Sequence, residues 1–381
     1  VINMQAGSPS KDTWVTATEP ERTVVFESAP ETPRATRESA LLSLPSRVVE
    51  NLYWMGRYAE RAEASLRLLR TVFVLLNGED PITPDARRIL LQTVTQITVT
   101  LPGFTNASEE LLANPEEELL LIILDDNRIG SIKSTLNSML SSADESKELL
   151  STDTIRVIND LRDALDDLDV TLAGGLTSAP EEALDPLVTA LAALSGLMQE
   201  SMIRGVGWRF MELGKRIERS RQIINSLRNL MTPVTGESTQ STLLTALLTS
   251  MEVMITYRRR GRVRRGIELG LELVMLDDSN PRALIFQLER LQQLLDKLPQ
   301  TDTSTGELNE EERALLEATT SLKLSRLSHL LETTSDKRVD MDNLLQQLEK
   351  LLDDFNRFIS DKHFDHLTDP QQLVTTFWDG Q

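Results

Sequence analysis

The sequence predicts an all-α protein: a multi-helix bundle built from two duplicated helical repeats, with an irregular N-terminal tail. Three observations predict it. Apolar residues recur at alternating steps of three and four over long stretches, as they do on one face of a helix. Period-two alternation, which marks a half-buried strand, is nearly absent. A helical pattern containing a Glu-Arg pair occurs twice, once at Glu60-Arg61 and once at Glu218-Arg219.

Composition divides the chain into five parts. Residues 1–15 resemble the end of a preceding domain, and residues 16–41 are rich in Thr, Glu, Pro, Ser and Ala, which predicts a flexible linker. The first helical repeat is expected over residues 42–200 and the second over residues 201–360. Residues 361–381 are expected to form a C-terminal tail.

Helical periodicity and the placement of Pro and Gly predict the individual elements. The expected helices span residues 46–77, 84–100, 116–124, 127–150, 154–170, 181–203, 206–231, 241–260, 262–277, 281–298, 308–333 and 338–360. Pro45 precedes the first of them, at a point where a first helical turn tolerates proline. Asn280 and Pro281 predict an N-cap and a first helical residue.

The two repeats share a short core of Gly, a basic residue, two residues and Glu-Arg, at residues 56–61 and 214–219. The turns at residues 125–127 and 277–281 and the Leu-Leu pairs at 90–91 and 243–244 correspond as well. Two units of about 150 residues therefore indicate a duplication and a pseudo-twofold bundle. Under that symmetry we expect Glu60 to face Arg219, and Glu218 to face Arg61.

Composition limits the function. The 381 residues carry 40 basic against 59 acidic side chains, a net charge of −19, which argues against general nucleic-acid binding. The absence of cysteine excludes disulfides and thiolate chemistry and suits a reducing cytoplasm. The longest aliphatic run, Leu119–Leu124, is too short to span a membrane. We therefore expect a cytoplasmic protein without a membrane partner. Because the chain begins at Val1, it is open whether it is a fragment of a longer fusion.

The segment SRVVENLYWMGRYAERAEASLRLL, residues 46–69, closely resembles the opening of the alpha-E domain, an all-helical domain named for its Glu-Arg motif. Residues 256–291 resemble its downstream block, and the resemblance covers roughly residues 42–360. This domain is often fused behind a circularly permuted ATP-grasp domain, and residues 10–15, SKDTWV, resemble the end of that part. The chain departs from the family at residues 4–9, where the family is richer in Ser, Gln and Gly. It also departs at residues 131–150, where the family is usually rich in arginine and this chain has only two lysines.

The resemblance implies a function. In such systems the ATP-grasp part would form an acyl phosphate and couple an amine to it, with transglutaminase-like and proteasome-like hydrolases as possible neighbours. We expect a helical accessory or substrate-binding module of an ATP-grasp-type carboxylate–amine ligase that acts on peptides or amino acids. The chain would not be catalytic alone and would bind no cofactor, whereas ATP and Mg²⁺ would serve the ATP-grasp part. A non-catalytic scaffold and a stand-alone enzyme using the Glu/Arg cluster are the alternatives.

The Glu-Arg motifs supply the first candidate site, and no residue is assigned a catalytic role. Guanidinium groups suit bidentate recognition of carboxylate or phosphate, and the glutamates would bind an amine. The alternative is a buried ion-pair network that fixes the register of the helices. The ligand-binding candidates are Trp54, Arg57, Glu60, Arg61, Lys215, Glu218 and Arg219.

The second candidate site is the basic segment 257–265, in which six arginines occupy eight positions. The anion-binding candidates are Tyr257, Arg258, Arg259 and Arg262, and the alternative is a set of ion pairs with surface acids. Asp278, Asn280 and Pro281 are assigned to a structural turn. No metal site is expected, because no second cluster completes the His and Asp residues near the C-terminus.

Overall fold

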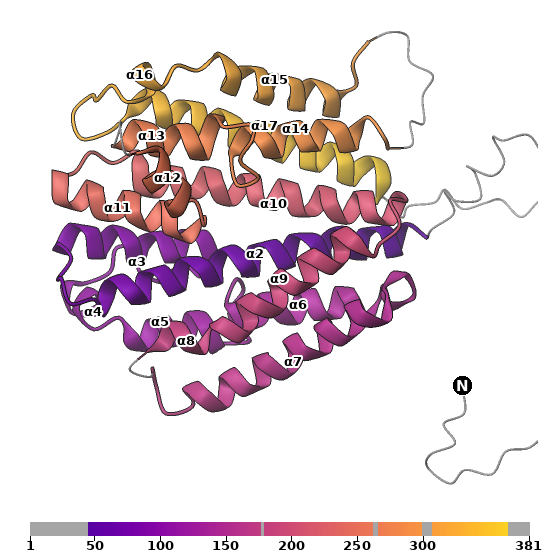
Figure 1. Cartoon of the computed structure of the whole chain (residues 1–381), viewed down its shortest axis with the longest axis horizontal. Helices are drawn as coiled ribbons and strands as arrows, with labels where there is room; N and C mark the ends of the chain where they lie inside the picture. The colour runs from indigo at the N-terminus through magenta and orange to yellow at the C-terminus, as the bar shows by residue number, and fades with distance from the viewer. Residues whose placement is uncertain (1–44, 177–178, 262–265, 299–306, 365–381) are drawn as a thin grey trace, which may run out of the picture. The chain divides into compact units, whose positions relative to one another are not determined.

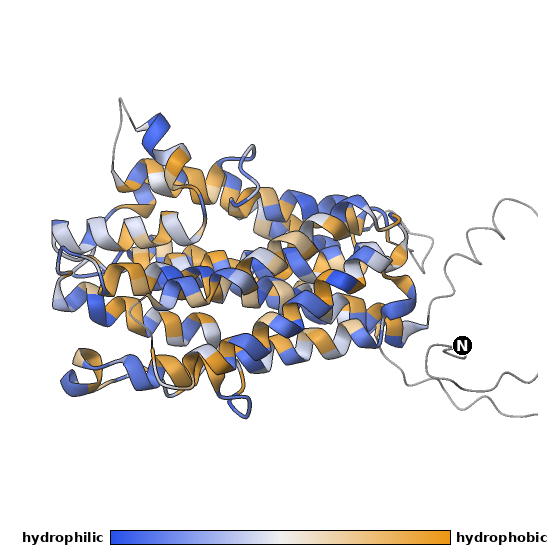
Figure 2. Ribbon diagram, turned by 60° about the horizontal axis from the view of Figure 1, so that its bottom comes forward, coloured by the Kyte–Doolittle hydropathy of each residue, from blue (hydrophilic) through white to orange (hydrophobic). Residues whose placement is uncertain are grey.

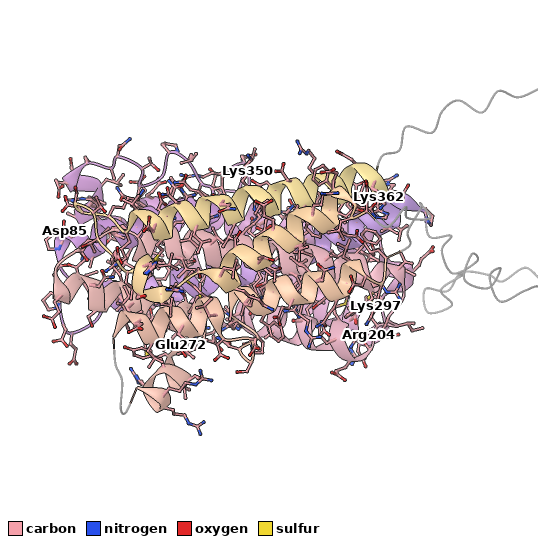
Figure 3. The ribbon with its side chains drawn as sticks, turned by 90° about the horizontal axis from the view of Figure 1, so that it is seen from above. Asp85, Arg204, Glu272, Lys297, Lys350 and Lys362 are labelled. Carbon is pink, nitrogen blue, oxygen red and sulfur yellow. The ribbon has the colours of Figure 1, made fainter. Side chains whose placement is uncertain are left out.

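Two long helices, α2 (Ser46–Leu76) and α10 (Val206–Met231), lie side by side at the centre of the fold (Figure 1). The structure is a computed structural model that describes residues 45–176, 179–261, 266–298 and 307–364. Asp85, just beyond α2, lies at the opposite end of the helices from Arg204, just before α10 (Figure 3). The two central helices therefore run in the same direction.

Further helices flank this central pair on both sides (Figure 1). Next to α2 lie α6 (Ile132–Asp144) and α9 (Asp185–Glu200), with α7 (Thr152–Leu172) packed outside α9. Next to α10 lie α14 (Leu284–Leu295) and α17 (Val339–His363), with α15 (Glu310–Leu324) packed outside them. Helices α3 (Pro84–Thr98) and α11 (Glu237–Ser250) each contact both central helices.

The remaining elements are short. They are α4 (Glu109–Ala113), α5 (Glu116–Leu124), the 3-10 turn η2 (Lys147–Leu149), α8 (Pro180–Ala183), α12 (Met254–Arg260), α13 (Ile267–Leu271), the π-helical turn η3 (Glu272–Leu276) and α16 (Leu327–Leu330). Within the described ranges there is no β-strand, only isolated bridges that join Pro233 and Thr334 to Lys337. The all-α prediction is confirmed for this part of the chain.

Hydrophobic and hydrophilic residues alternate along the helices, as the amphipathic patterns predict (Figure 2). The central helix α2 is an exception to simple amphipathicity, because helices surround it and it buries residues on several sides. Its buried set includes apolar side chains such as Leu52, Leu66 and Phe73, but also Glu60 and Glu63. Charged groups in the middle of a bundle need partners, which the neighbouring helices supply.

Three predicted elements agree closely with the structure, at 46–77, 116–124 and 206–231. Others are shorter or broken. The element expected at 127–150 begins only at Ile132, because Ser131 caps it by accepting from the Ser134 N–H at 3.0 Å. The element expected at 241–260 is two helices, since Glu252 has a φ of 59°, which a right-handed helix does not allow.

The expected role of Asn280 and Pro281 at the start of a helix is wrong. Helix α14 begins at Leu284, and Asn280 instead closes the preceding turn. Its amide donates to the Leu273 carbonyl at 2.7 Å, and its Oδ1 accepts from the Arg282 N–H at 3.0 Å.

Corrections also apply near the C-terminus. The element expected at 308–333 ends at Leu324, because Ser325 has an extended conformation and α16 follows separately. The last helix continues to His363, so the predicted tail at 361–381 begins inside it. The predicted tail at 1–15 and linker at 16–41 lie outside the described residues.

Candidate functional site

The central helices touch through two glycines. A Cβ atom built on Gly56 would lie 2.2 Å from the Met211 carbonyl oxygen, and one built on Gly214 would lie 2.2 Å from the Tyr53 carbonyl oxygen. Any side chain at either position would overlap the opposite backbone. This close approach brings the Glu-Arg pairs, one turn further along each helix, within hydrogen-bonding distance of each other.

The Glu-Arg pairs cross from one helix to the other. Arg219 donates through Nε and Nη2 to the two carboxylate oxygens of Glu60 at 2.5 and 2.6 Å. Arg61 donates to Glu218 at 2.7 and 3.1 Å. The cross-pairing expected from the repeat is confirmed. Both carboxylate side chains are almost completely buried, at 3% and 2% exposure.

Arg57 extends the network in a way that the repeat does not predict. Its Nε and Nη2 donate to Glu218 at 2.9 and 2.7 Å, so two arginines hold one carboxylate. Its Nη1 donates to Asn356 Oδ1 at 2.9 Å, and the Tyr53 hydroxyl donates to the same oxygen. The Trp54 ring lies 5.2 Å from the Arg57 guanidinium, a cation–π contact that covers this side of the network.

The network holds Glu218 as a carboxylate. Burial alone would raise the pKa of Glu218, but Arg57 and Arg61 outweigh it and bring the pKa down to about 2. A general acid or base works best with a pKa near the working pH, so Glu218 is poorly suited to proton transfer at neutral pH.

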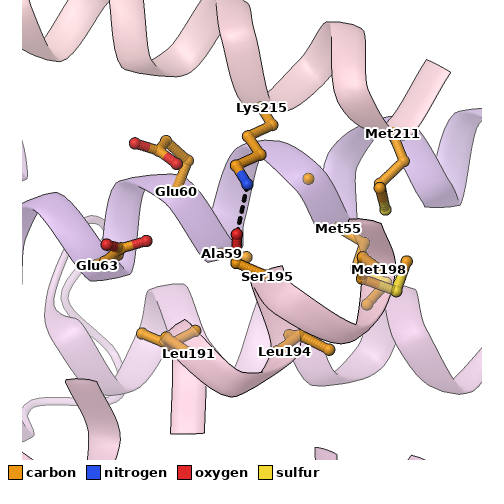
Figure 4. Close-up of a pocket in the computed structure, with 11 residues that line it drawn as sticks. Met55, Ala59, Glu60, Glu63, Leu191, Leu194, Ser195, Met198, Met211 and Lys215 are labelled. Carbon is orange, nitrogen blue, oxygen red and sulfur yellow. Dashed lines mark hydrogen bonds between the residues drawn. The ribbon is translucent and has the colours of Figure 1, made fainter. Parts of the chain in front are cut away.

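Lys215, the counterpart of Arg57 in the second motif, points elsewhere. Its Nζ donates to Ser195 Oγ of α9 at 2.5 Å, and burial, together with Arg219, lowers its pKa. Figure 4 shows it beside Glu60 and Glu63 on one side and three methionines on the other. These side chains line a cavity of about 30 Å³ between α2, α9 and α10. At about 10–15 Å³ for each water, a cavity of this size holds two or three waters.

A second layer of ion pairs supports the first. Glu63 accepts from Arg67 at 2.9 Å and from Arg282 at 3.0 Å, and Arg282 comes from the turn before α14. Burial would raise the pKa of Glu63, but Arg282, Arg219 and Arg67 hold it at about 2. Motif reasoning did not find Arg282 or Asn356, because they reach the site from a distant turn and a distant helix and have no local sequence pattern.

The basic segment lies apart from this network. Arg258 and Arg259 are exposed on α12, and Arg262 lies outside the described residues. The Tyr257 hydroxyl accepts from the Gly266 N–H at 3.0 Å. Arg260 pairs with Asp277 at 2.7 Å. At least this arginine therefore follows the ion-pair alternative.

The turn before α14 contains Asp278, Asn280 and Pro281, as assigned. Asp277 shapes it by accepting from the Ser279 N–H at 3.0 Å. Across the described ranges no group of three or more His, Asp or Glu side chains is arranged to hold a metal ion. In that same part of the chain, no helix combines the length and apolar character that crossing a bilayer requires.

The fold and the network define a class: all-helical proteins organised around two adjacent helices with exchanged Glu-Arg pairs. The chain belongs to the alpha-E family, which is described as a predicted alpha-helical domain with a conserved ER motif and which matches residues 44–364.

The chain has relatives at the sequence level in mycobacteria. The chain is 30% identical over 361 residues to the uncharacterized protein Rv2567 of Mycobacterium tuberculosis, and to the same extent to the uncharacterized protein Mb2597 of Mycobacterium bovis. Each alignment covers 91% of this chain but 40% of the relative, so the chain spans less than half the length of these proteins. No solved structure matches the chain.

Proposed function

We propose that this chain is a helical accessory or substrate-binding module of an ATP-dependent carboxylate–amine ligase. The chemistry would reside in an ATP-grasp part that uses ATP and Mg²⁺, and a peptide or amino acid would be the substrate. Membership of the alpha-E family supports the proposal, together with the likeness of residues 10–15 to the end of an ATP-grasp domain. Relatives more than twice as long as this chain are compatible with such a fusion.

The observation that carries the accessory role is the state of the network. Glu60 and Glu218 are buried and each accepts two or more hydrogen bonds from arginine. With its pKa near 2, Glu218 stays ionised at neutral pH and gives the cluster no proton to transfer. This arrangement favours positioning and binding over catalysis by the cluster itself.

We further propose that the domain arose by internal duplication. Helices α5 and η3 both end at an aspartate with nearly equal backbone angles, φ −73° and ψ 101° at Asp125, and φ −77° and ψ 99° at Asp277. Each carboxylate accepts from the N–H two residues later at 3.0 Å. The order of long helices after each Glu-Arg helix is also the same, which supports a pseudo-twofold axis between α2 and α10.

The test is turnover. ATP hydrolysis and amide formation would be measured across a panel of amino acids and short peptides, with this chain alone and with the chain joined to its upstream domain. We expect turnover only in the joined protein. Turnover by the chain alone would overturn the proposal and move the chemistry into the helical bundle.

Three variants of the joined protein then separate binding from scaffolding. Arg57→Ala and Arg219→Ala remove cluster arginines, and Arg47→Ala removes an α2 arginine whose side chain is 76% exposed. A substrate-binding role predicts a raised KM in the first two variants at an unchanged fold. Loss of thermal stability at unchanged KM would assign the cluster to scaffolding alone.

A further inference from the structure

A second cavity shares Glu60 in its lining with the cavity beside Lys215. It has a volume of about 40 Å³ and lies between α2, α3, α10 and α11. Its polar lining includes Arg67, Arg219, Arg282, Gln222, Ser226 and Ser250. We call it the arginine cavity. Ser226, Ser250 and Arg282 are only half-buried, so the cavity is reachable from the surface.

The charges around the arginine cavity do not balance among the side chains that are largely covered. Three guanidinium groups, from Arg67, Arg219 and Arg282, have side-chain exposures of 10%, 10% and 27%. Two carboxylates, Glu60 and Glu63, face them at 3% and 6% exposure. One positive charge is left over among these groups, none of which is more than 27% exposed, and this excess favours a negatively charged group of a ligand at this point.

One more carboxylate contacts this set from outside. Glu252 also pairs with Arg67, but its side chain is 55% exposed. Water and salt screen an exposed charge far more than a buried one, so Glu252 compensates the excess only weakly.

Gln222 supplies the second, independent observation. The residue is 8% exposed, and its Nε2 donates to Glu218 Oε1 at 3.3 Å. Because a carboxylate only accepts hydrogen bonds, this contact fixes the orientation of the amide. Its Oε1 is then a buried acceptor for which the described residues offer no hydrogen-bond donor. A buried acceptor of this kind is costly unless a ligand or water donates to it.

The size of the cavity limits the ligand. One water-sized group needs about 10–15 Å³ of such space, so the arginine cavity takes only a few non-hydrogen atoms. That is the size of a carboxylate group with its nearest neighbours. A larger ligand would have to leave its remaining atoms at the half-buried rim.

We propose that the arginine cavity binds the carboxylate of an α-amino acid, either free or at the C-terminus of a peptide. The carboxylate would accept hydrogen bonds from the guanidinium groups of Arg67, Arg219 and Arg282, and the α-nitrogen would donate to Gln222 Oε1. Both ligands share a carboxylate with an N–H group one carbon away. The inference rests on the proposed function, for which it names the substrate class, and it involves no covalent step.

Binding to this chain alone tests the inference, with four probes followed by calorimetric titration. Glycine and N-acetylglycine carry both the carboxylate and the N–H group; acetate lacks the N–H, and methylamine lacks the carboxylate. We expect glycine or N-acetylglycine to bind about tenfold more tightly than acetate, because only they satisfy the buried oxygen of Gln222. Methylamine should not bind. The tighter of the first two probes identifies the source as a free amino acid or a peptide end.

Two variants make the test specific. Gln222→Met keeps the length of the side chain but removes the acceptor, so the affinity for glycine or N-acetylglycine should fall about tenfold while acetate is unaffected. Gln293→Met is the matched control, because Gln293 is exposed on α14 and does not line this cavity. Its affinities should equal those of the unaltered chain.

Three results would overturn the inference: equal affinity for glycine, N-acetylglycine and acetate, no effect of Gln222→Met in a variant that keeps its melting temperature, or no saturable binding of any probe. The proposed function fails separately. If no probe binds but the joined protein still forms amides, the cavity assignment is wrong and the accessory role stands. If the probes bind but the joined protein shows no turnover, the cavity assignment stands and the accessory role is wrong.

Discussion

The contact between α2 and α10 makes a sharp prediction about Gly56. Replacing Gly56 with Ala places a Cβ atom 2.2 Å from the Met211 carbonyl oxygen and 3.2 Å from the Lys215 backbone nitrogen. Both neighbours are backbone atoms of a helix held by other contacts, so no side chain can rotate away. The two helices must separate by about 1 Å to reach an ordinary contact distance of ~3.5 Å.

The size of the effect follows from two opposing contributions. Overpacking of this kind costs about 1–3 kcal/mol, and the separation also stretches the buried ion pair between Glu60 and Arg219 from 2.5 Å, which adds to the loss. Alanine gains about 1 kcal/mol over glycine in a helix interior. We therefore expect Gly56→Ala to lower the free energy of unfolding by roughly 2 kcal/mol. Gly214→Ala should behave alike, because its Cβ meets the Tyr53 carbonyl at the same 2.2 Å.

Gly196→Ala provides the matched control. Gly196 also lies within a helix, α9, but a Cβ built there meets no atom within 4 Å. This variant should raise the free energy of unfolding by up to about 1 kcal/mol. Urea denaturation followed by circular dichroism measures all three variants. Equal effects of Gly56→Ala and Gly196→Ala would refute the reasoning, since helix propensity would then explain both.

Two further predictions concern the charges of the network. A double-mutant cycle with Glu60→Ala and Arg219→Ala should give a coupling energy above about 1.5 kcal/mol. The same cycle on the exposed pair Arg47–Glu145 should give less than about 1 kcal/mol. Additive losses of stability at the buried pair would contradict the network. Acid should also destabilise the fold through Glu218, because folding lowers the pKa of this residue from 4.5 to about 2. Its contribution to the free energy of unfolding is complete above pH 4.5 and is lost as the pH falls toward 2. The loss is roughly 3 kcal/mol in all. Chemical denaturation across that range should show a smaller loss for Glu218→Gln, and an unchanged pH dependence would refute the assignment.

Local patterns were sufficient for the central helices. The stripe of apolar residues and the Glu-Arg motifs predicted α2 and α10 to within one residue at each end, and the repeat predicted which glutamate faces which arginine. These features depend on the apolar periodicity and on the two copies of the Glu-Arg motif, both of which are visible in the sequence. Helix ends that depend on backbone conformation were not predictable. Glu252 separates α11 from α12 because it has a positive φ, and no glycine in the sequence indicates such a conformation at this position.

Tertiary contacts explain what the sequence left out of the site. Asn356 joins Arg57 from 299 positions away, and Arg282 joins Glu63 from 219 positions away. No motif marks either residue, because each belongs to an ordinary amphipathic helix or turn. The different hydrogen-bond partners of Arg57 and Lys215 also depend on neighbouring helices. Arg57 donates to Glu218, whereas Lys215 donates to Ser195 of α9. Corresponding positions in the two Glu-Arg motifs therefore need not have corresponding partners.

The distance along the chain between the central helices has a consequence for synthesis. Glu60 and its partner Arg219 are 159 residues apart. At a translation rate of about 5–20 residues per second, α2 leaves the ribosome roughly 10–30 s before α10 does. During that time Glu60 and the glycine face of α2 lack the partners on α10 that they have in the folded protein. The nascent first half must cover this face with its own α3, α6 and α9, or a chaperone must hold it, until the arginines of the second half arrive.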